Sequence, residues 1–425
     1  MLQEFDKCFK KIDTYFKLIG LSICKEDSNR TIFQRLKYHW LCSVNTFFFD
    51  LSIVGQIIWL FWGIATGQSF LQITFLVPCI TLCLLARVKL TSYVYYAHKN
   101  NNVIAILRNL HSVKRSHEEI FKNILTPWIK FLSNVLLSLS LLCAGGVIAF
   151  ATGPFIIMAS VYYTTGKFEL FLPFIVWYPF DAFQPHAYPF VFGHQLWSAW
   201  VAVCSVLGTD GFFFTCCTFI HTQFLILHHD IEQLVKVDAS QNEYDRSVAF
   251  KMGLVEVVNR HRNLIGCVEL LNTIYAKGTF FNVASSSIVI CATGFNLVVN
   301  YALMAPFICF VNFGMLQIFF YCYYGDYVMR SSTQIGDAIY NSHWYKAGVM
   351  EKKYLLTILV RSQKPCKFTA YLFNVINFTS FTRVRYSYIL YTIKRFPERF
   401  DEVYFAIGFK THTSKSRATL YTYLY

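Results

Sequence analysis

The chain has 425 residues, of which 55% are hydrophobic and 18% aromatic, but only 15% are charged. A soluble domain carries about 25% charged residues, so this composition excludes an ordinary soluble fold and indicates an all-α protein with several membrane-spanning helices. The formal charge of +14 does not indicate nucleic-acid binding, because the basic residues lie in short segments between apolar runs and form no stripe.

The N-terminal segment, residues 1–39, is predicted to be cytoplasmic and to contain an amphipathic helix. Its apolar residues recur at helical spacing: Leu2, Phe5, Phe9, Ile12, Phe16 and Ile19. This pattern favours a helix that lies on the inner surface of the membrane. Acidic residues and lysines occur throughout the segment, so it is not a cleavable signal peptide.

Seven later segments are apolar enough to cross a bilayer, which requires about 20 residues of helix. They are residues 40–65, 68–96, 127–155, 189–227, 278–303, 304–329 and 366–394. Lysine and arginine concentrate before the first span and in the loops after the second, fourth and sixth, whereas the alternate loops hold only Lys167. Because basic loops stay in the cytoplasm, the N-terminus is predicted inside and the C-terminus outside, opposite to a G-protein-coupled receptor.

Two connecting segments carry structural signals of their own. Neither proline nor glycine occurs between Gly211 and Gly253, so the fourth span is expected to continue as a cytoplasmic stalk to about Val237. Residues 246–277 should return beside that stalk. The outer segment 154–189 holds five of the ten prolines and several aromatic residues, and it is predicted to form an ordered, non-helical lid over the outer face.

Charged residues within the predicted spans are candidates for function, because hydrocarbon solvates charge poorly. Asp210 is expected to form a hydrogen bond or ion pair with a neighbouring helix. Arg383 and Arg385, in the last predicted span, are expected to face acidic or aromatic partners. The His-His-Asp run at 228–230 could indicate a metal site, but adjacent helical residues diverge, so a polar cuff is the preferred interpretation.

Other chemical signatures are missing from the sequence. The fourteen cysteines are scattered, mostly inside apolar runs, with no zinc-type Cys-x-x-Cys pair. No nucleotide-binding loop, pair of catalytic carboxylates or nucleophile elbow stands out. We therefore expect no enzymatic activity, no metal and no cofactor.

An ordered set of motifs occupies the chain from the sixth span onward. It comprises Cys-Tyr-Tyr-Gly-Asp-Tyr-Val-Met-Arg-Ser-Ser at 322–332, Ile-Gly-Asp-Ala-Ile-Tyr-Asn-Ser-His-Trp-Tyr at 335–345, Leu355-Leu356, Arg-Ser-Gln-Lys-Pro at 361–365, Lys-Phe-Thr-Ala at 367–370 and Tyr-Ser-Tyr at 386–388. This set resembles the insect odorant receptor family. The His-Thr-Gln-Phe-Leu-Ile-Leu run at 221–227 and the inverted seven-span topology agree with the resemblance.

The resemblance implies an odorant-gated, non-selective cation channel. Such channels are tetramers in which the last helix lines the pore and a cytoplasmic segment forms a shared anchor. Residues 40–329 would then hold the first six spans, the pocket and the stalk, 330–365 the anchor with a short helix at about 346–361, and 366–394 the pore-lining span. Most members work with an obligate co-receptor that carries a long insertion between spans four and five. That loop is short here, so this chain is expected to be the tuning subunit of a heterotetramer in the plasma membrane of olfactory neuron dendrites.

The resemblance also places a ligand pocket and a gate. The pocket would lie in the outer halves of spans two, three, four and six and would accept a small, volatile, hydrophobic ligand. Its candidate residues are Phe70, Thr74, Phe75, Gly146, Ala149, Phe150, Phe192, Trp197, Val201, Phe307, Phe310 and Phe313. For each of them, ordinary helix packing is the alternative. The candidate gate residues, near the outer end of the last span, are Ile389, Thr392 and Ile393. Arg383 and Arg385 are expected to face away from such a cation pore, and a role in conductance is the alternative.

Alternative functions are a gustatory-type receptor channel and a multi-pass transporter. A gustatory receptor typically carries a Thr-Tyr-x5-Gln-Phe pattern in its last span, and residues 366–394 contain none. Transporters usually show internal repeats, and these seven unequal spans have no two-half symmetry. Members of the odorant receptor family usually end near the position of Lys394, so residues 395–425 are expected to be either a gene-model artefact or an extracellular extension.

Overall fold

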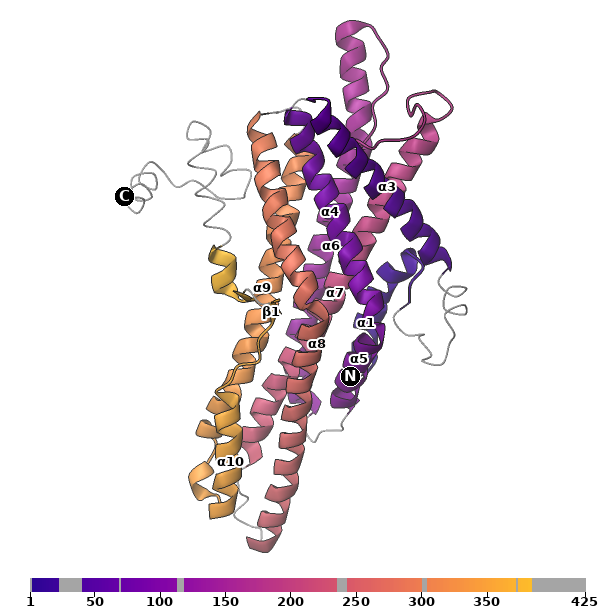
Figure 1. Cartoon of the computed structure of the whole chain (residues 1–425). Helices are drawn as coiled ribbons and strands as arrows, with labels where there is room; N and C mark the ends of the chain where they lie inside the picture. The colour runs from indigo at the N-terminus through magenta and orange to yellow at the C-terminus, as the bar shows by residue number, and fades with distance from the viewer. Residues whose placement is uncertain are drawn as a thin grey trace, which may run out of the picture.

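The computed structural model describes residues 2–22, 40–68, 70–112, 118–234, 243–299, 304–371 and 374–383. Figure 1 shows long helices standing side by side in one elongated bundle, with α7 near its centre and α10 at the lower end. The elements are α1 (Leu2–Leu18), α3 (Trp40–Ala65), α4 (Phe70–Tyr95), α5 (Ala97–Ser112), α6 (Glu118–Thr165), α7 (Tyr188–Leu234), α8 (Glu243–Val299), α9 (Met304–Asn341), the 3-10 turn η2 (Trp344–Lys346), α10 (Val349–Ser362), β1 (Thr369–Ala370) and β2 (Asn374–Val375).

Helices occupy the first six predicted spans. Within the described residues, four stretches are long and apolar enough to cross a membrane: Trp40–Ala65, Gln72–Tyr95, Phe121–Thr165 and Tyr188–Leu234. They correspond to the first four predicted spans. The fifth and sixth, 278–303 and 304–329, fall in α8 and α9 and adjoin residues 300–303, which lie outside the described part.

The seventh predicted span begins later than expected. Between 366 and 377 the chain forms the antiparallel pair β1–β2, and helix resumes only at 378–383. Side chains of α8 and α9 hold this backbone extended: Thr369 N donates to Asn272 Oδ1 at 2.8 Å, and Cys366 N donates to Ser332 Oγ at 3.0 Å. The predicted helical start at 366 is therefore wrong, because these bonds take the amides that a helix would use.

Helix α7 forms the core of the bundle. Its most apolar window is 94% buried, although α6 is more apolar and only 28% of its window is buried. Apolar surface that faces lipid needs no protein cover, so hydropathy and burial diverge. Helix α7 packs against α1, α3, α4, α6, α8 and α9 and consequently carries few lipid-facing residues.

The N-terminal helix α1 packs against α7. Its apolar stripe is buried, from Phe5 and Phe9 to Phe16. A Cβ atom on Gly208 would lie 3.0 Å from Phe16 Cε1, so the small residue lets the two helices approach closely. The predicted amphipathic helix is confirmed, and its apolar stripe packs against protein, a role that the same pattern serves equally well.

The predicted continuation of the fourth span as one long helix is confirmed as far as Leu234. Helix α7 has 47 residues and α8 has 57, so α7 alone is about 70 Å long, far beyond the roughly 30 Å hydrocarbon core. The two helices run antiparallel: Asp230 pairs with Arg260, and the Tyr275 hydroxyl donates to the Thr209 carbonyl at 2.9 Å. The first of these contacts also explains the polar cuff at 228–230, and no metal-binding cluster occurs among the described residues.

Helix α9 joins the bundle to the anchor. A Cβ atom on Gly325 would lie 2.5 Å from the Ile376 carbonyl oxygen, so α9 and the segment after β2 are in backbone contact. Lower down, Gly336 faces Ser362 of α10. Helix α10 covers most of the short anchor helix expected at about 346–361.

Candidate ligand pocket

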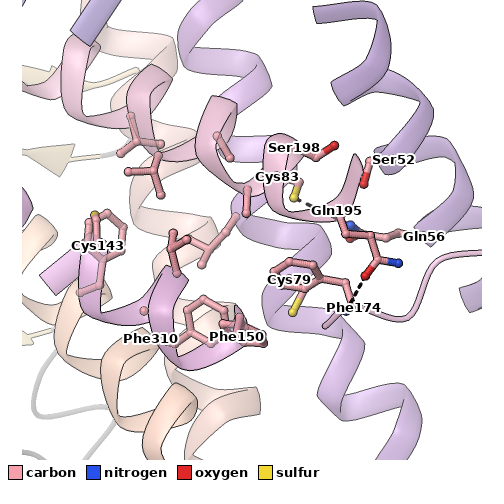
Figure 2. A pocket seen from close by; sticks show the side chains of 18 of the residues that line it. Ser52, Gln56, Cys79, Cys83, Cys143, Phe150, Phe174, Gln195, Ser198 and Phe310 are labelled. Carbon is pink, nitrogen blue, oxygen red and sulfur yellow. Dashed lines mark hydrogen bonds between the residues drawn. The ribbon is translucent and has the colours of Figure 1, made fainter. Parts of the chain in front are cut away.

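A cavity of about 120 Å³ lies among α3, α4, α6, α7 and α9 (Figure 2). This volume is comparable with that of a cavity of about 150 Å³ that holds benzene in another protein. The cavity is lined by Ser52, Gln56, Cys79, Leu82, Cys83, Leu142, Cys143, Gly146, Val147, Phe150, Phe174, Gln195, Ser198, Ala199, Ala202, Val203, Val206, Phe310 and Phe313. The lining contains no Asp, Glu, Lys, Arg or His side chain, so the cavity suits a neutral ligand.

One end of the cavity is aromatic. Phe150 of α6 and Phe310 of α9 have ring centroids 5.0 Å apart, and Phe150 stacks on Phe174 at 4.8 Å. Figure 2 shows Phe150 and Phe310 together on the side away from Ser52 and Ser198. Gly146, one turn before Phe150, has no side chain and so leaves space beside these rings.

The loop 166–187 closes one side of the cavity. Phe174 comes from this loop and is fixed by its N–H, which donates to Gln195 Oε1 at 2.9 Å. Nearby, Trp177 N donates to the Gly55 carbonyl at 3.1 Å. The expected ordered lid is therefore present, but it begins later than predicted: α6 continues through Pro154 to Thr165, because a single proline can be accommodated within a long membrane helix.

The other end is polar. Figure 2 shows Ser52 and Gln56 of α3 grouped with Gln195 and Ser198 of α7. All four are buried, with exposed fractions of 3% or less. Gln56 Nε2 makes a long contact of 3.9 Å to Cys83 Sγ. These groups provide directional chemistry in an otherwise apolar cavity.

A buried ion pair lies one helical turn beneath the cavity. Lys89 Nζ of α4 approaches Asp210 Oδ1 of α7 at 2.6 Å. Two donors from α9 complete the carboxylate's surroundings, Gln317 Nε2 at 2.6 Å and the Tyr321 hydroxyl at 2.7 Å. Asp210 follows the cavity residue Val206 by four positions, so the cluster connects three cavity-forming helices. The expected ion pair of Asp210 with a neighbouring helix is confirmed.

The predicted pocket residues divide into two groups. Gly146, Phe150, Phe310 and Phe313 line the cavity. The others in the described part do not line it: Phe70, Thr74, Phe75, Ala149, Phe192, Trp197 and Val201.

Five of the predicted residues that do not line the cavity lie in other surroundings. On α4 the cavity begins at Cys79, so Phe70, Thr74 and Phe75 lie nearer the outer end of that helix. Phe192 packs against Phe155 with centroids 5.3 Å apart, and Trp197 Nε1 donates to Asn45 Oδ1 at 3.2 Å.

Several candidates fall outside the described residues. The backbone of Phe307 belongs to α9, but its side chain is outside the description. The gate candidates Ile389, Thr392 and Ile393 and the basic residue Arg385 also lie outside it. Arg383 is exposed at the end of the described helix 378–383.

Helix α3 and the lid contributed lining residues that the sequence interpretation missed. Ser52 and Gln56 are polar and four residues apart, and they therefore lie on one face of the first predicted span. That spacing was the available signal. Nothing comparable marks Phe174, since it is one of several aromatic residues in its loop.

Comparison with known proteins identifies the fold. A family model described as 7tm Odorant receptor matches residues 69–388. The chain belongs to the odorant receptor family. Two relatives from Drosophila melanogaster agree with this. Putative odorant receptor 92a is 24% identical over 384 residues, covering 89% of this chain and 92% of its own length, and odorant receptor 67c is 24% identical over 341 residues, covering 79% and 82%.

Solved structures share the architecture of this odorant receptor. The insect olfactory receptor OR5 from Machilis hrabei superposes with a TM-score of 0.78 at 17% identity, covering 93% of this chain and 99% of that one. A second structure of OR5, in complex with eugenol, gives a TM-score of 0.77. The odorant receptor described here is thus a membrane receptor of the seven-span fold and not an enzyme.

Proposed function

We propose that this odorant receptor is the odorant-specific subunit of a ligand-gated, non-selective cation channel, which it forms as a heterotetramer with an obligate co-receptor. The observation that carries the proposal is the uncharged, mainly apolar cavity among α3, α4, α6, α7 and α9. A small, neutral, volatile molecule matches both its volume and its lining. The plasma membrane of olfactory neuron dendrites is the location that this function requires.

Helix α9 supports a link between ligand and pore. It contributes Phe310 and Phe313 to the cavity and Tyr321 to the buried cluster, and it then contacts the segment that leads to the last span at Gly325. A ligand that favours one position of α9 would act on all these contacts together. It can shift the channel equilibrium only by its differential affinity for the two positions.

The proposal includes a gate in the last span. Ile389, Thr392 and Ile393 fall in the part of the last span that follows the described helix 378–383. A ring of branched apolar side chains would close a pore by excluding water. The inverted topology, with a cytoplasmic N-terminus, is likewise proposed from the distribution of basic residues. An N-terminal epitope that antibodies label on intact cells would contradict that topology.

The test is co-expression with the co-receptor and current recording against a broad panel of odorants. We expect odorant-evoked cation currents that require both subunits. Gly146→Leu should fill the cavity and abolish the response, because its side chain enters the space beside Phe150. Gly145→Leu is the matched control, since a Cβ atom there meets nothing within 4 Å. Robust currents from this subunit alone, or equal loss in both variants, would contradict the proposal.

A further inference from the structure

Two polar side chains of the cavity are buried with atoms that lack hydrogen-bond partners. Gln56 is 2% exposed and Ser198 is 3% exposed. In the part of the chain that the structure describes, no partner lies within reach of Gln56 Oε1 or Ser198 Oγ. Buried polar atoms are nearly always paired, because leaving them unpaired is unfavourable. Both side chains line the cavity, so a molecule inside it can supply the missing bonds.

Ser198 differs in this respect from the other hydroxyl residues of α7. Ser205 Oγ donates to the carbonyl of Val201 at 2.7 Å, and Thr209 Oγ1 donates to the carbonyl of Ser205 at 2.8 Å. Hydroxyl groups in membrane helices commonly satisfy themselves in this way. Ser198 makes no such bond, so its hydroxyl is available to a ligand.

The two groups favour a hydroxyl over other functional groups. A ligand hydroxyl can donate to Gln56 Oε1 and accept from Ser198 Oγ at the same time. If the Gln56 amide is turned over, its Nε2 becomes the unpaired atom, and the same hydroxyl accepts from the amide and donates to Ser198. A carbonyl can only accept, and a hydrocarbon does neither. An ionised ligand would find no countercharge among the lining side chains.

Gln195 belongs to the same polar end but plays a lesser part. Its Oε1 already accepts from Phe174 N at 2.9 Å. Its Nε2 has no hydrogen bond of normal geometry, but it lies close enough to the Tyr178 hydroxyl to donate a distorted one. We therefore assign the ligand contacts to Gln56 and Ser198.

We propose that the cavity selects compact, neutral alcohols, cyclic or aromatic, whose hydroxyl bonds Gln56 and Ser198 while the ring packs toward Phe150 and Phe310. Figure 2 shows the polar and aromatic ends on opposite sides, which fixes the orientation of such a molecule. The inference rests on the proposed function for its role in signalling. The binding preference itself can be measured independently of channel activity.

The experiment compares molecules of matched shape. Cyclohexanol, cyclohexanone and methylcyclohexane form one set, and p-cresol and p-xylene form another. With the receptor and co-receptor expressed together, we expect the alcohols to activate at concentrations about tenfold to a hundredfold lower than the hydrocarbons. The ketone should fall between them. Equal potency of alcohol and hydrocarbon, or equal potency of alcohol and ketone, would overturn the proposal.

Three variants locate the preference. Ser198→Ala and Gln56→Met remove the polar atoms at nearly constant volume. In each variant, the activating concentrations of alcohol and hydrocarbon should differ by less than about threefold, while the response to hydrocarbon persists. Ser205→Ala is the matched control, because that serine bonds its own helix and does not line the cavity. An unchanged preference in both cavity variants would show that the hydroxyl binds elsewhere.

A second measurement separates this inference from the proposed function. The purified full chain is heated in detergent with each molecule, and the midpoint of unfolding is recorded. A ligand that binds the folded state raises the midpoint. A rise with alcohols that exceeds the rise with hydrocarbons supports the pocket chemistry even if no currents occur, in which case only the channel assignment fails. Equal shifts, or no shift with any of the five molecules, would overturn the pocket chemistry.

Discussion

Replacement of Lys89 by methionine tests how much the ion pair beneath the cavity contributes to stability. The variant leaves the Asp210 carboxylate buried at 2% exposure with Gln317 and Tyr321 as donors but without a countercharge. Removal of one partner from a buried pair typically costs about 3–5 kcal/mol, because the remaining charge is not solvated. For a protein of 425 residues, with an unfolding entropy of about 2.1 cal/mol/K per residue, we expect the midpoint of thermal unfolding to fall by about 3–6 °C.

The double variant Lys89→Met/Asp210→Asn provides the control. The amide at position 210 can still accept a hydrogen bond from Tyr321, and no unpaired charge remains, so most of the lost stability should return. The assay is fluorescence-detected thermal unfolding of each detergent-purified variant. A coupling energy between the two positions below about 0.5 kcal/mol would refute the reasoning, since it would mean that the two charges do not stabilise each other.

Three further predictions address the hairpin, the stalk and the gate. Gly325→Ala should sharply reduce surface expression, because its Cβ atom would lie 2.5 Å from the Ile376 carbonyl oxygen, whereas Gly145→Ala should be tolerated; equal expression would contradict this contact. Burial, and secondarily the nearby Arg361, lower the pKa of His261 in the stalk to about 4 from 6.5. The unfolded chain therefore binds more protons between these values, so stability should fall by about 2 kcal/mol from pH 7.5 to pH 5, and His261→Gln should flatten this slope. Ile389→Ser, co-expressed with the co-receptor, should raise the holding current without odorant if Ile389 lines the gate, and an unchanged current at normal surface expression would remove it from the gate.

The parts of the fold that the sequence predicted are those that depend on run length and composition. Apolar runs of about 20 or more residues correctly predicted the helices α3, α4, α6 and α7. The absence of proline and glycine after Gly211 correctly predicted that α7 continues beyond the length of a span. The start of the last span was misplaced because its amides bond to Asn272 and Ser332, residues far away in sequence. The apolar stripe of α1 follows from helical spacing, but its packing partner α7 could not be predicted, because lipid and protein present the same apolar surface to an amphipathic helix.

The sequence correctly predicted only those lining residues that are aromatic or small and lie in the expected half of a span, such as Gly146, Phe150 and Phe310. Which side chains enter a cavity depends on the rotation of each helix about its axis, and packing sets this rotation. The sequence fixes which residues share a face of one helix, but not which neighbour that face meets. Hence Trp197 was placed in the pocket, although it bonds Asn45 of α3.

The central position of α7 has a consequence for how the receptor is made. Its packing partners include α1, α3, α4 and α6, which precede it, but also α8 and α9, which leave the ribosome later. When α7 enters the membrane, Asp210 can meet Lys89, but Gln317 and Tyr321 have not yet been synthesised. Until α9 has been synthesised, Asp210 therefore has only one of its three partners. The helix at the centre of the finished bundle is thus the one whose stability depends most on the chain that follows it.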